Sequence, residues 1–202
     1  MTKADFLKVV ASHGYDIYFG AKRHLATYDI IEKFPKSIAL IGVCIGVVQL
    51  WKPNLPHNDL ISVGLVLISI LAYTITQYDA EKEKYNNVGK ELIRLYKELK
   101  ALYYKAKGDQ NFNYEHYELE LNRILDEYSN LGISKQIFFS NTRAHITFFG
   151  ESQIEWMNEQ LEFKLWKDKI PGVYKILIYL FSILIALLIV GGLVKLLIDY
   201  LI

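Results

Sequence analysis

The chain has 202 residues, of which 52% are hydrophobic and 22% are charged. Its formal net charge is +1, from 23 basic and 22 acidic residues, so bulk charge does not favour nucleic acid, and we expect no direct nucleic-acid binding. The single cysteine, Cys44, excludes an intrachain disulfide framework and a cysteine-based metal site within one chain. The charged residues lie almost entirely outside three long apolar runs, and this segregation is typical of a membrane protein.

Residues 1–36 predict an N-terminal amphipathic cytoplasmic helix. Apolar and aromatic side chains recur there at helical spacing, while most basic and acidic residues fall off that stripe. The stripe consists of Phe6, Val10, His13, Ile17, Gly20, His24, Tyr28 and Ile31. Such a helix can lie along the membrane surface or pack on other cytoplasmic helices, and the sequence leaves both alternatives open.

Residues 37–78 predict a hairpin of two transmembrane helices joined by a short polar turn. No residue between Lys36 and Lys52 is charged, and the run 60–78 is also without charge. A span needs about 20 predominantly apolar residues. The first run is shorter, but Lys36 and Lys52 can extend toward the headgroups and Trp51 suits the interface, so a crossing is still expected.

Residues 171–202 predict a third, C-terminal transmembrane helix, because the run 176–194 again carries no charge. Its presence favours membrane spans over the alternative of buried helices in a soluble bundle. Basic residues are concentrated before the first run, after the second and before the third, whereas the hairpin turn carries only Lys52. By the positive-inside rule we expect three crossings, with the N-terminus in the cytoplasm and the C-terminus outside.

Residues 79–170 predict a cytoplasmic helical region, either a helical hairpin or a coiled coil. A heptad-like seam consists of Tyr85, Val88, Leu92, Leu95, Leu99 and Leu102. After a break at residues 108–111, a second series consists of Tyr114, Tyr117, Leu121, Ile124, Tyr128 and Leu131. The two series can pack as an antiparallel hairpin within one chain, or the first can be an oligomerisation seam of two to four strands.

Between residues 132 and 150 the helical period fades, and two aromatic pairs flank the polar stretch SNTRAH. These pairs are Phe138-Phe139 and Phe148-Phe149. Two short packed helices are the favoured interpretation, and a loop that touches the membrane is the alternative. Residues 151–169 then predict another amphipathic helix.

The sequence shows no grouping of serine, histidine and carboxylate that defines a nucleophile with its base, and no phosphate- or dinucleotide-binding motif. We expect no enzyme activity, no cofactor and no metal. Asp109, Asn111, Asn113 and Glu120 do fall at positions 1, 3, 5 and 12 of a calcium-loop pattern. Position 6 is Tyr114, where the sharp turn needs glycine, so we expect a helix-capping turn instead.

Each span of the hairpin carries a stripe of small or weakly polar residues. The first stripe is Ala39, Gly42, Gly46 and Gln49, and the second is Ser62, Ser69, Ala72 and Thr76. The spacing of Gly42 and Gly46 lets helices approach closely. The stripes can pack the hairpin on itself, or part of them can line an aqueous path in an oligomer. No ionisable residue lies in a span core, which disfavours a coupled transporter.

The segment 15–47, in which FGAKRHLATYDIIEKFP leads directly into a hairpin of spans, resembles the SLATT proteins. These are two-transmembrane effectors associated with bacterial nucleotide-signalling and SLOG conflict systems. The third span makes the chain similar to the subgroup with an additional C-terminal helix that is found near reverse transcriptases. The resemblance implies a prokaryotic antiviral effector that oligomerises and breaches the inner membrane, so that the infected cell dies or stops growing. It brings no catalytic residues.

The chain carries no recognisable nucleotide sensor or synthase domain, so its trigger is expected to come from a partner. The expected partners are membrane lipid, further copies of the chain, and a protein or a nucleotide-signalling or reverse-transcriptase system encoded nearby. The alternative function is a non-conducting membrane anchor or scaffold that recruits or regulates a neighbouring enzyme. A housekeeping channel is disfavoured, because no selectivity filter is identifiable.

Overall fold

The fold is all-α, as the sequence predicts, in a computed structural model that describes residues 1–132 and 135–201, with side chains described up to residue 192. The helices are α1 (Lys3–Trp51), α2 (Asn58–Thr76), α3 (Lys82–Gly108), α4 (Tyr114–Asn130), α5 (Ser140–Glu151), α6 (Glu155–Leu161) and α7 (Gly172–Leu201). A 3₁₀ turn, η1 (Asp79–Glu81), and a π-helical turn, η2 (Leu165–Lys169), complete them. The chain divides into two units, Met1–Glu162 and Phe163–Ile202, which we describe separately.

Three helical stretches in the described part of the chain are long and apolar enough to cross a membrane. They are Lys3–Trp51, whose apolar half is the expected first span, Asn58–Gly108, which begins with α2, and Gly172–Gly192 in α7. The three spans expected from the uncharged runs are therefore confirmed by length and composition.

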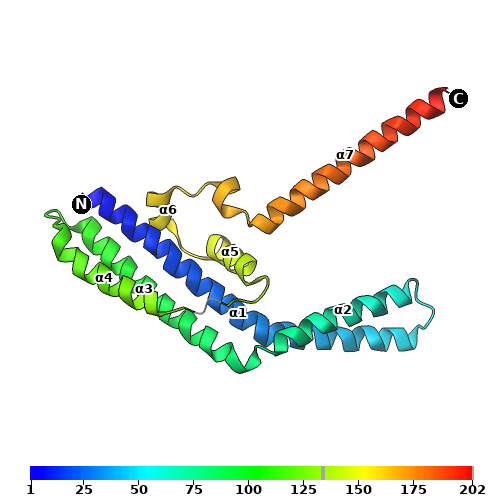
Figure 1. Cartoon of the computed structure of the whole chain (residues 1–202), viewed down its shortest axis with the longest axis horizontal. Coiled ribbons are helices and arrows are strands. Elements are labelled where there is room, and N and C mark those ends of the chain that lie inside the picture. The colour runs from blue at the N-terminus through cyan, green and yellow to red at the C-terminus, as the bar shows by residue number, and fades with distance from the viewer. Residues whose placement is uncertain (133–134, 202) are drawn as a thin grey trace. The chain divides into compact units, whose positions relative to one another are not determined.

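Helix α1 is continuous from the bundle, where it packs on α3, into the hairpin that it forms with α2 (Figure 1). The side chain of Thr2 caps its first turn by accepting a hydrogen bond from the backbone N–H of Asp5 at 3.2 Å. Pro35 lies inside the helix without ending it, although proline removes one backbone hydrogen bond. Residues 36 and 37 therefore lie in one continuous helix. The expected boundary between them is the point where this helix passes from the bundle into the hairpin.

The N-terminal half of α1 is packed in protein. Its side chains Phe6, Val10 and Ile17 are fully buried. They pack against the other helices of the bundle, since α1 contacts α3, α5, α6 and, to a smaller extent, α4. The sequence left two alternatives open for this helix, and the structure shows it packed on the other helices of the bundle.

Helices α3 and α4 form the expected antiparallel hairpin, and α3 lies along α1 (Figure 1). The buried face of α4 consists of Tyr117, Leu121 and Ile124, which belong to the second predicted series. The two helices thus use their apolar series to close a single small bundle around α1.

The region after α4 differs from the prediction. Residues 140–151 form one helix, α5, in place of two, and the predicted helix over 151–169 is broken. It is interrupted at residues 152–154 and again at Glu162, whose φ of 49° is left-handed. Packing explains the break, because Trp156 is buried against α1 at Gly14, and its indole N–H donates to the Tyr96 hydroxyl at 3.0 Å.

The second unit consists of η2 and α7. The Asp168 carboxylate accepts a hydrogen bond from the Lys164 backbone N–H at 2.9 Å, and the ring of Trp166 contacts that of Tyr179 at a centroid distance of 6.4 Å. Between residues 176 and 190 the large apolar side chains of α7 are exposed. Such a surface is stable in lipid and unfavourable in water.

Candidate functional site

The candidate site is the transmembrane hairpin formed by the second half of α1 and by α2. Large apolar side chains cover its outer surface, including Leu50, which is 86% exposed, and Leu60, which is 72% exposed. Surfaces of this kind are expected to face acyl chains, and the two helices satisfy their backbone hydrogen bonds internally. The hairpin therefore has the properties of a membrane-embedded element.

The glycines of the first predicted stripe are not packed against α2. A Cβ built at Gly42 or at Gly46 would have no described heavy atom within 4 Å outside its own helix. Ala39, on the same stripe, is exposed. Among the described residues of the first unit this face of α1 has no neighbour, so it remains available to another transmembrane helix.

Two predicted residues do meet inside the hairpin, close to its turn. The Gln49 amide donates to the Asn58 side-chain oxygen at 2.7 Å and to the Ser62 hydroxyl at 3.1 Å. Ser62 in turn donates to the Asn58 backbone carbonyl at 3.1 Å. Asn58 was not among the predicted residues, although its place four residues before Ser62 on a helix could have indicated it.

The rest of the second stripe is divided between exposed and buried positions. Ser69 and Thr76 are exposed, whereas Ala72 is buried. The Thr76 hydroxyl donates to the Tyr73 carbonyl at 2.7 Å, and the Thr74 hydroxyl donates to Leu71 in the same way. These hydroxyls are satisfied by their own helix, which lets them lie in an apolar surrounding.

A charged cluster lies at the base of the hairpin, the end opposite its turn. Glu32 of α1 pairs with Lys36 and, at 2.7 Å, with Lys82 of α3, which also pairs with Asp79 at 3.0 Å. Hydrogen bonds from Lys36 and Lys82 lower the pKa of the Glu32 carboxyl to about 2, and the bonds from Glu32 and Asp79 raise the pKa of Lys82. The cluster ties α1 to the start of α3.

An apolar cluster lies beside these charges, and we call it the base cluster. It consists of the buried side chains Ile31, Tyr85 and Ile137, against which Tyr28, Ile30, Ile75 and Tyr78 pack. The Tyr85 hydroxyl donates to the Lys135 carbonyl at 2.8 Å, so the loop before α5 is attached to α3. The sequence did not indicate Ile137, because the helical period is absent around it.

The predicted oligomerisation seam is covered within the chain. Tyr85, Leu92, Leu95, Leu99 and Leu102 have at most 1% of their surface exposed, and Val88 is half-buried. Helix α3 makes its main packing on α1 and a smaller one on α4. In this conformation the seam builds the single-chain bundle, so its side chains are not available to a second chain.

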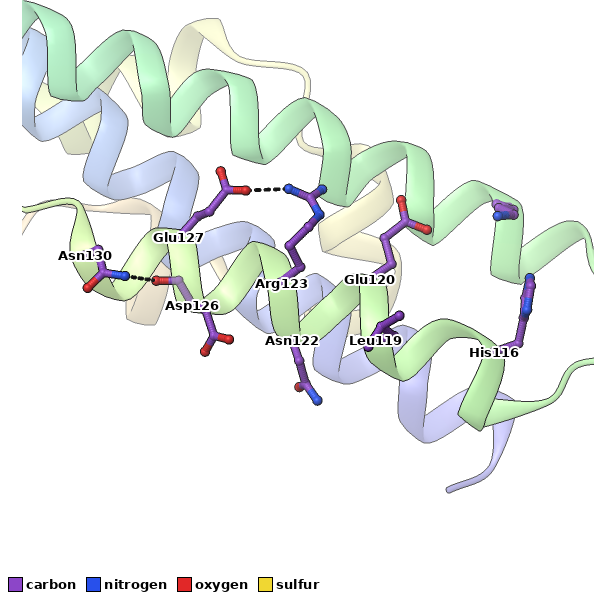
Figure 2. Close-up of a pocket in the computed structure, with 9 residues that line it drawn as sticks. His116, Leu119, Glu120, Asn122, Arg123, Asp126, Glu127 and Asn130 are labelled. Carbon is purple, nitrogen blue, oxygen red and sulfur yellow. Dashed lines mark hydrogen bonds and ion pairs between the residues drawn. The ribbon is translucent and has the colours of Figure 1, made fainter.

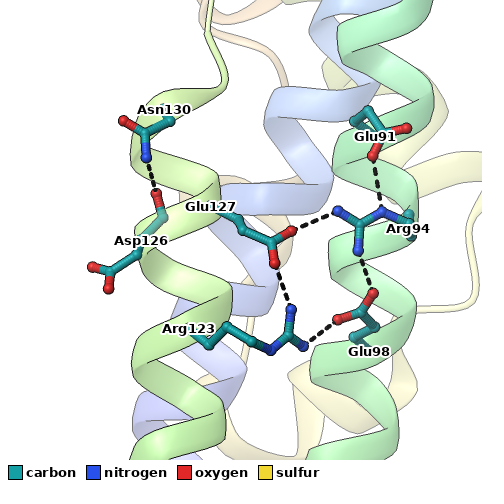
Figure 3. A network of polar contacts seen from close by, with 7 residues as sticks. All are labelled: Glu91, Arg94, Glu98, Arg123, Asp126, Glu127 and Asn130. Carbon is teal, nitrogen blue, oxygen red and sulfur yellow. Dashed lines mark hydrogen bonds and ion pairs between the residues drawn. The ribbon is translucent and has the colours of Figure 1, made fainter.

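An ion-pair network joins α3 to α4 on the bundle surface (Figure 3). Arg94 pairs with Glu91 at 2.8 Å, with Glu127 at 2.6 Å and with Glu98, and Arg123 pairs with both Glu98 and Glu127. The hydrogen bond from Arg94, and to a smaller extent the one from Arg123, lowers the pKa of the Glu127 carboxyl. Because the members are partly exposed, we assign the network a structural role in fixing the register of the two helices.

A shallow groove of about 740 Å³ runs along α4 beside this network (Figure 2). Arg123 and Glu127 point toward α3, whereas Asn122 and Asp126 point away from it. In the described parts of the chain, no three histidine, cysteine or carboxylate groups are placed so as to hold a metal ion. The groove brings together no nucleophile and base.

The calcium-like turn between α3 and α4 is a capping structure, as predicted. The Asn113 side chain accepts from the Glu115 backbone N–H at 3.1 Å and caps α4. Asp109 accepts from the Asn111 backbone N–H at 2.8 Å and from the Tyr117 hydroxyl at 2.9 Å. These carboxylate and amide oxygens are engaged in holding the turn.

The fold and the hairpin together define an all-α membrane protein in which a helical bundle is continuous with a two-helix transmembrane hairpin. Residues 1–178 match the family model described as SMODS and SLOG-associating 2TM effector domain 6. The chain therefore belongs to this SLATT family, as its sequence suggested. The match covers the bundle and the hairpin and ends just inside α7. No curated protein and no solved structure matches the chain.

Proposed function

We propose that this membrane effector acts in bacterial antiviral defence by oligomerising in the inner membrane and disrupting it through pore formation, with abortive infection as the result. The N-terminus and the bundle lie in the cytoplasm in this proposal, as the distribution of basic residues favours. The membership of the chain in an effector family supports the general role. The role requires neither a catalytic residue nor a cofactor.

One observation carries the oligomeric part of the proposal. Gly42 and Gly46 form a small-residue face in a transmembrane helix, and that face has no described neighbour within 4 Å in the first unit, Met1–Glu162. Association of helices in lipid depends on close backbone approach at such positions. We propose that this face contacts the hairpin of another copy.

The continuity of α1 supplies the means of activation. The helix passes without interruption from the bundle into the membrane, and the Glu32–Lys82 ion pair and the base cluster fasten it to α3. A partner that displaces α3 or α4 therefore also shifts the first span. We propose that a nearby encoded protein, or a nucleotide-signalling or reverse-transcriptase system, gives this signal.

The test is membrane potential in bacteria, measured with a voltage-sensitive dye while the protein is induced alone and with its genomic neighbour. The double variant Gly42→Leu/Gly46→Leu should insert normally and fail to depolarise the cells. Gly64→Leu is the matched control, because Gly64 also lies in a span with no described atom within 4 Å of its Cβ position. Depolarisation by the double variant at wild-type protein levels contradicts the packing role of the glycine face.

The second candidate function is a non-conducting anchor or scaffold that recruits or regulates a neighbouring enzyme. The open groove along α4 favours it, because Leu119 beside the groove is 81% exposed and offers a docking contact. An anchor predicts an unchanged membrane potential for the inserted wild-type protein under both conditions. That result would favour the anchor function over pore formation.

A further inference from the structure

The loop 135–139, between α4 and α5, presents two large aromatic side chains to the surroundings. Phe138 is 79% exposed and Phe139 is 59% exposed, and their ring centroids lie 4.2 Å apart. Phe139 has a φ of 68° in the left-handed region, which is unusual for a bulky residue and costs conformational energy. The structure thus keeps an apolar pair exposed at an energetic cost, which suggests that something covers it.

Apolar packing and hydrogen bonds hold the loop 135–139 against α1 and α3. Ile137 is buried in the base cluster with Ile31 and Tyr85. The side-chain oxygen of Gln136 accepts from the Thr27 hydroxyl at 2.6 Å, and the Lys135 carbonyl accepts from Tyr85 at 2.8 Å. These contacts hold the neighbouring phenylalanines at a fixed place relative to α1 and α3.

That place is level with the cytoplasmic ends of the two spans. Ile75 and Tyr78, which pack against the base cluster, both belong to the uncharged run 60–78. Ile31 lies six residues before Ser37, or about 9 Å along α1. The polar layer on each side of the hydrocarbon is about 5–8 Å thick, so Ile31 lies near its outer edge, whereas Ile75 and Tyr78 lie at the end of a span. The base cluster, and the loop attached to it, lies between these two levels. In Figure 1 the start of α5 is the end that lies nearer to the hairpin.

We propose that Phe138 and Phe139 insert into the interfacial layer of the leaflet at the cytoplasmic base of the hairpin, as a membrane contact that does not span the bilayer. The occupant is lipid, because Ile137, the neighbour of the pair, belongs to the cluster against which Ile75 and Tyr78 pack at the end of the second span. The chemistry around the pair suits headgroups. Lys135 lies with its ammonium 5.1 Å from the ring of Tyr78, and Arg143 pairs with Asp29 at 2.9 Å. Basic groups beside apolar wedges are typical of interfacial segments.

This contact fixes the bundle as well as the hairpin against the bilayer. A motion of α3 relative to α1 changes the base cluster, and the loop moves with Ile137 and Tyr85. The proposal depends on membrane insertion of the hairpin and is independent of whether the chain forms a pore.

A fluorescent label at position 138 tests the insertion in the full chain. In a Cys44→Ser background, Phe138→Cys carries an environment-sensitive nitrobenzoxadiazole label, and the protein is reconstituted into phosphatidylethanolamine–phosphatidylglycerol vesicles. Leu119→Cys is the control, since Leu119 is 81% exposed and adjoins Tyr117, whose ring contacts Phe6 at the far end of α1. The label at 138 should be quenched severalfold more by lipids with nitroxides near the headgroup, and severalfold less by aqueous iodide, than the label at 119.

Two results overturn the proposal. Equal access of iodide to positions 138 and 119 means that the pair faces water. Protection from iodide without quenching by nitroxide lipids means that protein, such as a second copy, covers the pair. Phe139→Cys repeats the measurement at the neighbouring ring, so a folding defect in one labelled variant does not decide the outcome.

Discussion

Gly89 of α3 lies directly against Leu25 of α1, so that a Cβ built on Gly89 falls 2.8 Å from both Cγ and Cδ2 of that leucine. Separations this short require either the Leu25 side chain or the helix backbones to shift. We expect Gly89→Val to lower the free energy of unfolding by about 1–3 kcal/mol, the usual cost of overpacking. Thermal unfolding of the full chain in detergent, followed by near-ultraviolet circular dichroism, measures the effect.

Gly20→Ala is the matched control for this close approach. A Cβ at Gly20 meets Leu92 at 3.6 Å, an ordinary contact, and alanine favours the helix by up to about 1 kcal/mol over glycine. The control should be neutral or stabilising. If Gly89→Val is as stable as Gly20→Ala, the α1–α3 contact is looser than the structure describes.

His24 makes the stability of the bundle dependent on pH. The side chain is buried, its Nδ1 lies 3.2 Å from the Gln136 amide nitrogen, and burial followed by the charge of Arg23 lowers its pKa to about 4. The unfolded chain, with a histidine pKa near 6.5, binds the proton more readily, so stability is complete above pH 6.5 and is lost as the pH falls toward 4. The loss is on the order of 2–3 kcal/mol.

His24→Gln should remove this dependence. Midpoints of chemical unfolding at pH 7 and pH 4.5 should differ clearly for the wild type and much less for the variant. The slope with pH is the quantity to compare, because the variant also changes packing. An identical slope in both proteins shows that His24 does not control acid sensitivity.

Because of the ion pairs of Glu32, we expect the folded protein to lose further stability at lower pH. Its folded pKa of about 2 is below the ordinary value of 4.5, so its contribution is present above pH 4.5 and disappears as the pH falls toward 2. In Glu32→Gln the stability should therefore change less over this range than in the wild type. High salt should reduce the difference between the two proteins, because the ion pairs with Lys36 and Lys82 are partly exposed to solvent.

The sequence predicted those features that depend on local pattern. The uncharged runs defined the spans, because charge is excluded from hydrocarbon regardless of the tertiary structure. The turn before α4 was predicted as a capping structure, since Asn113 needs only its neighbours to cap a helix. The heptad spacing likewise identified Leu92 and Leu95 as apolar positions of α3.

Features that depend on the choice of packing partner were not predictable in this way. The seam of α3 shows that one face is apolar, but periodicity does not say whether α1 or another chain covers it. The sequence analysis separated an N-terminal helix over residues 1–36 from the first span, yet α1 continues through this boundary and through Pro35. The base cluster joins Ile31, Tyr85 and Ile137, which are far apart in sequence, and the glycine–leucine contact between α3 and α1 is visible only in three dimensions.

The hydrogen bonds of Gln49 predict how firmly the two spans are joined near their turn. Gln49→Leu removes the donor to Asn58 and Ser62 and leaves the Asn58 side-chain oxygen without that partner. Polar bonds between membrane helices contribute about 0.6–2 kcal/mol, so the variant should unfold at correspondingly lower denaturant in detergent. Gln49→Asn is the control that keeps an amide with a shorter reach. Gln49 lies one turn beyond Gly46. A variant that weakens the turn and leaves the proposed oligomer intact would separate the stability of the hairpin from the proposed assembly through the glycine face.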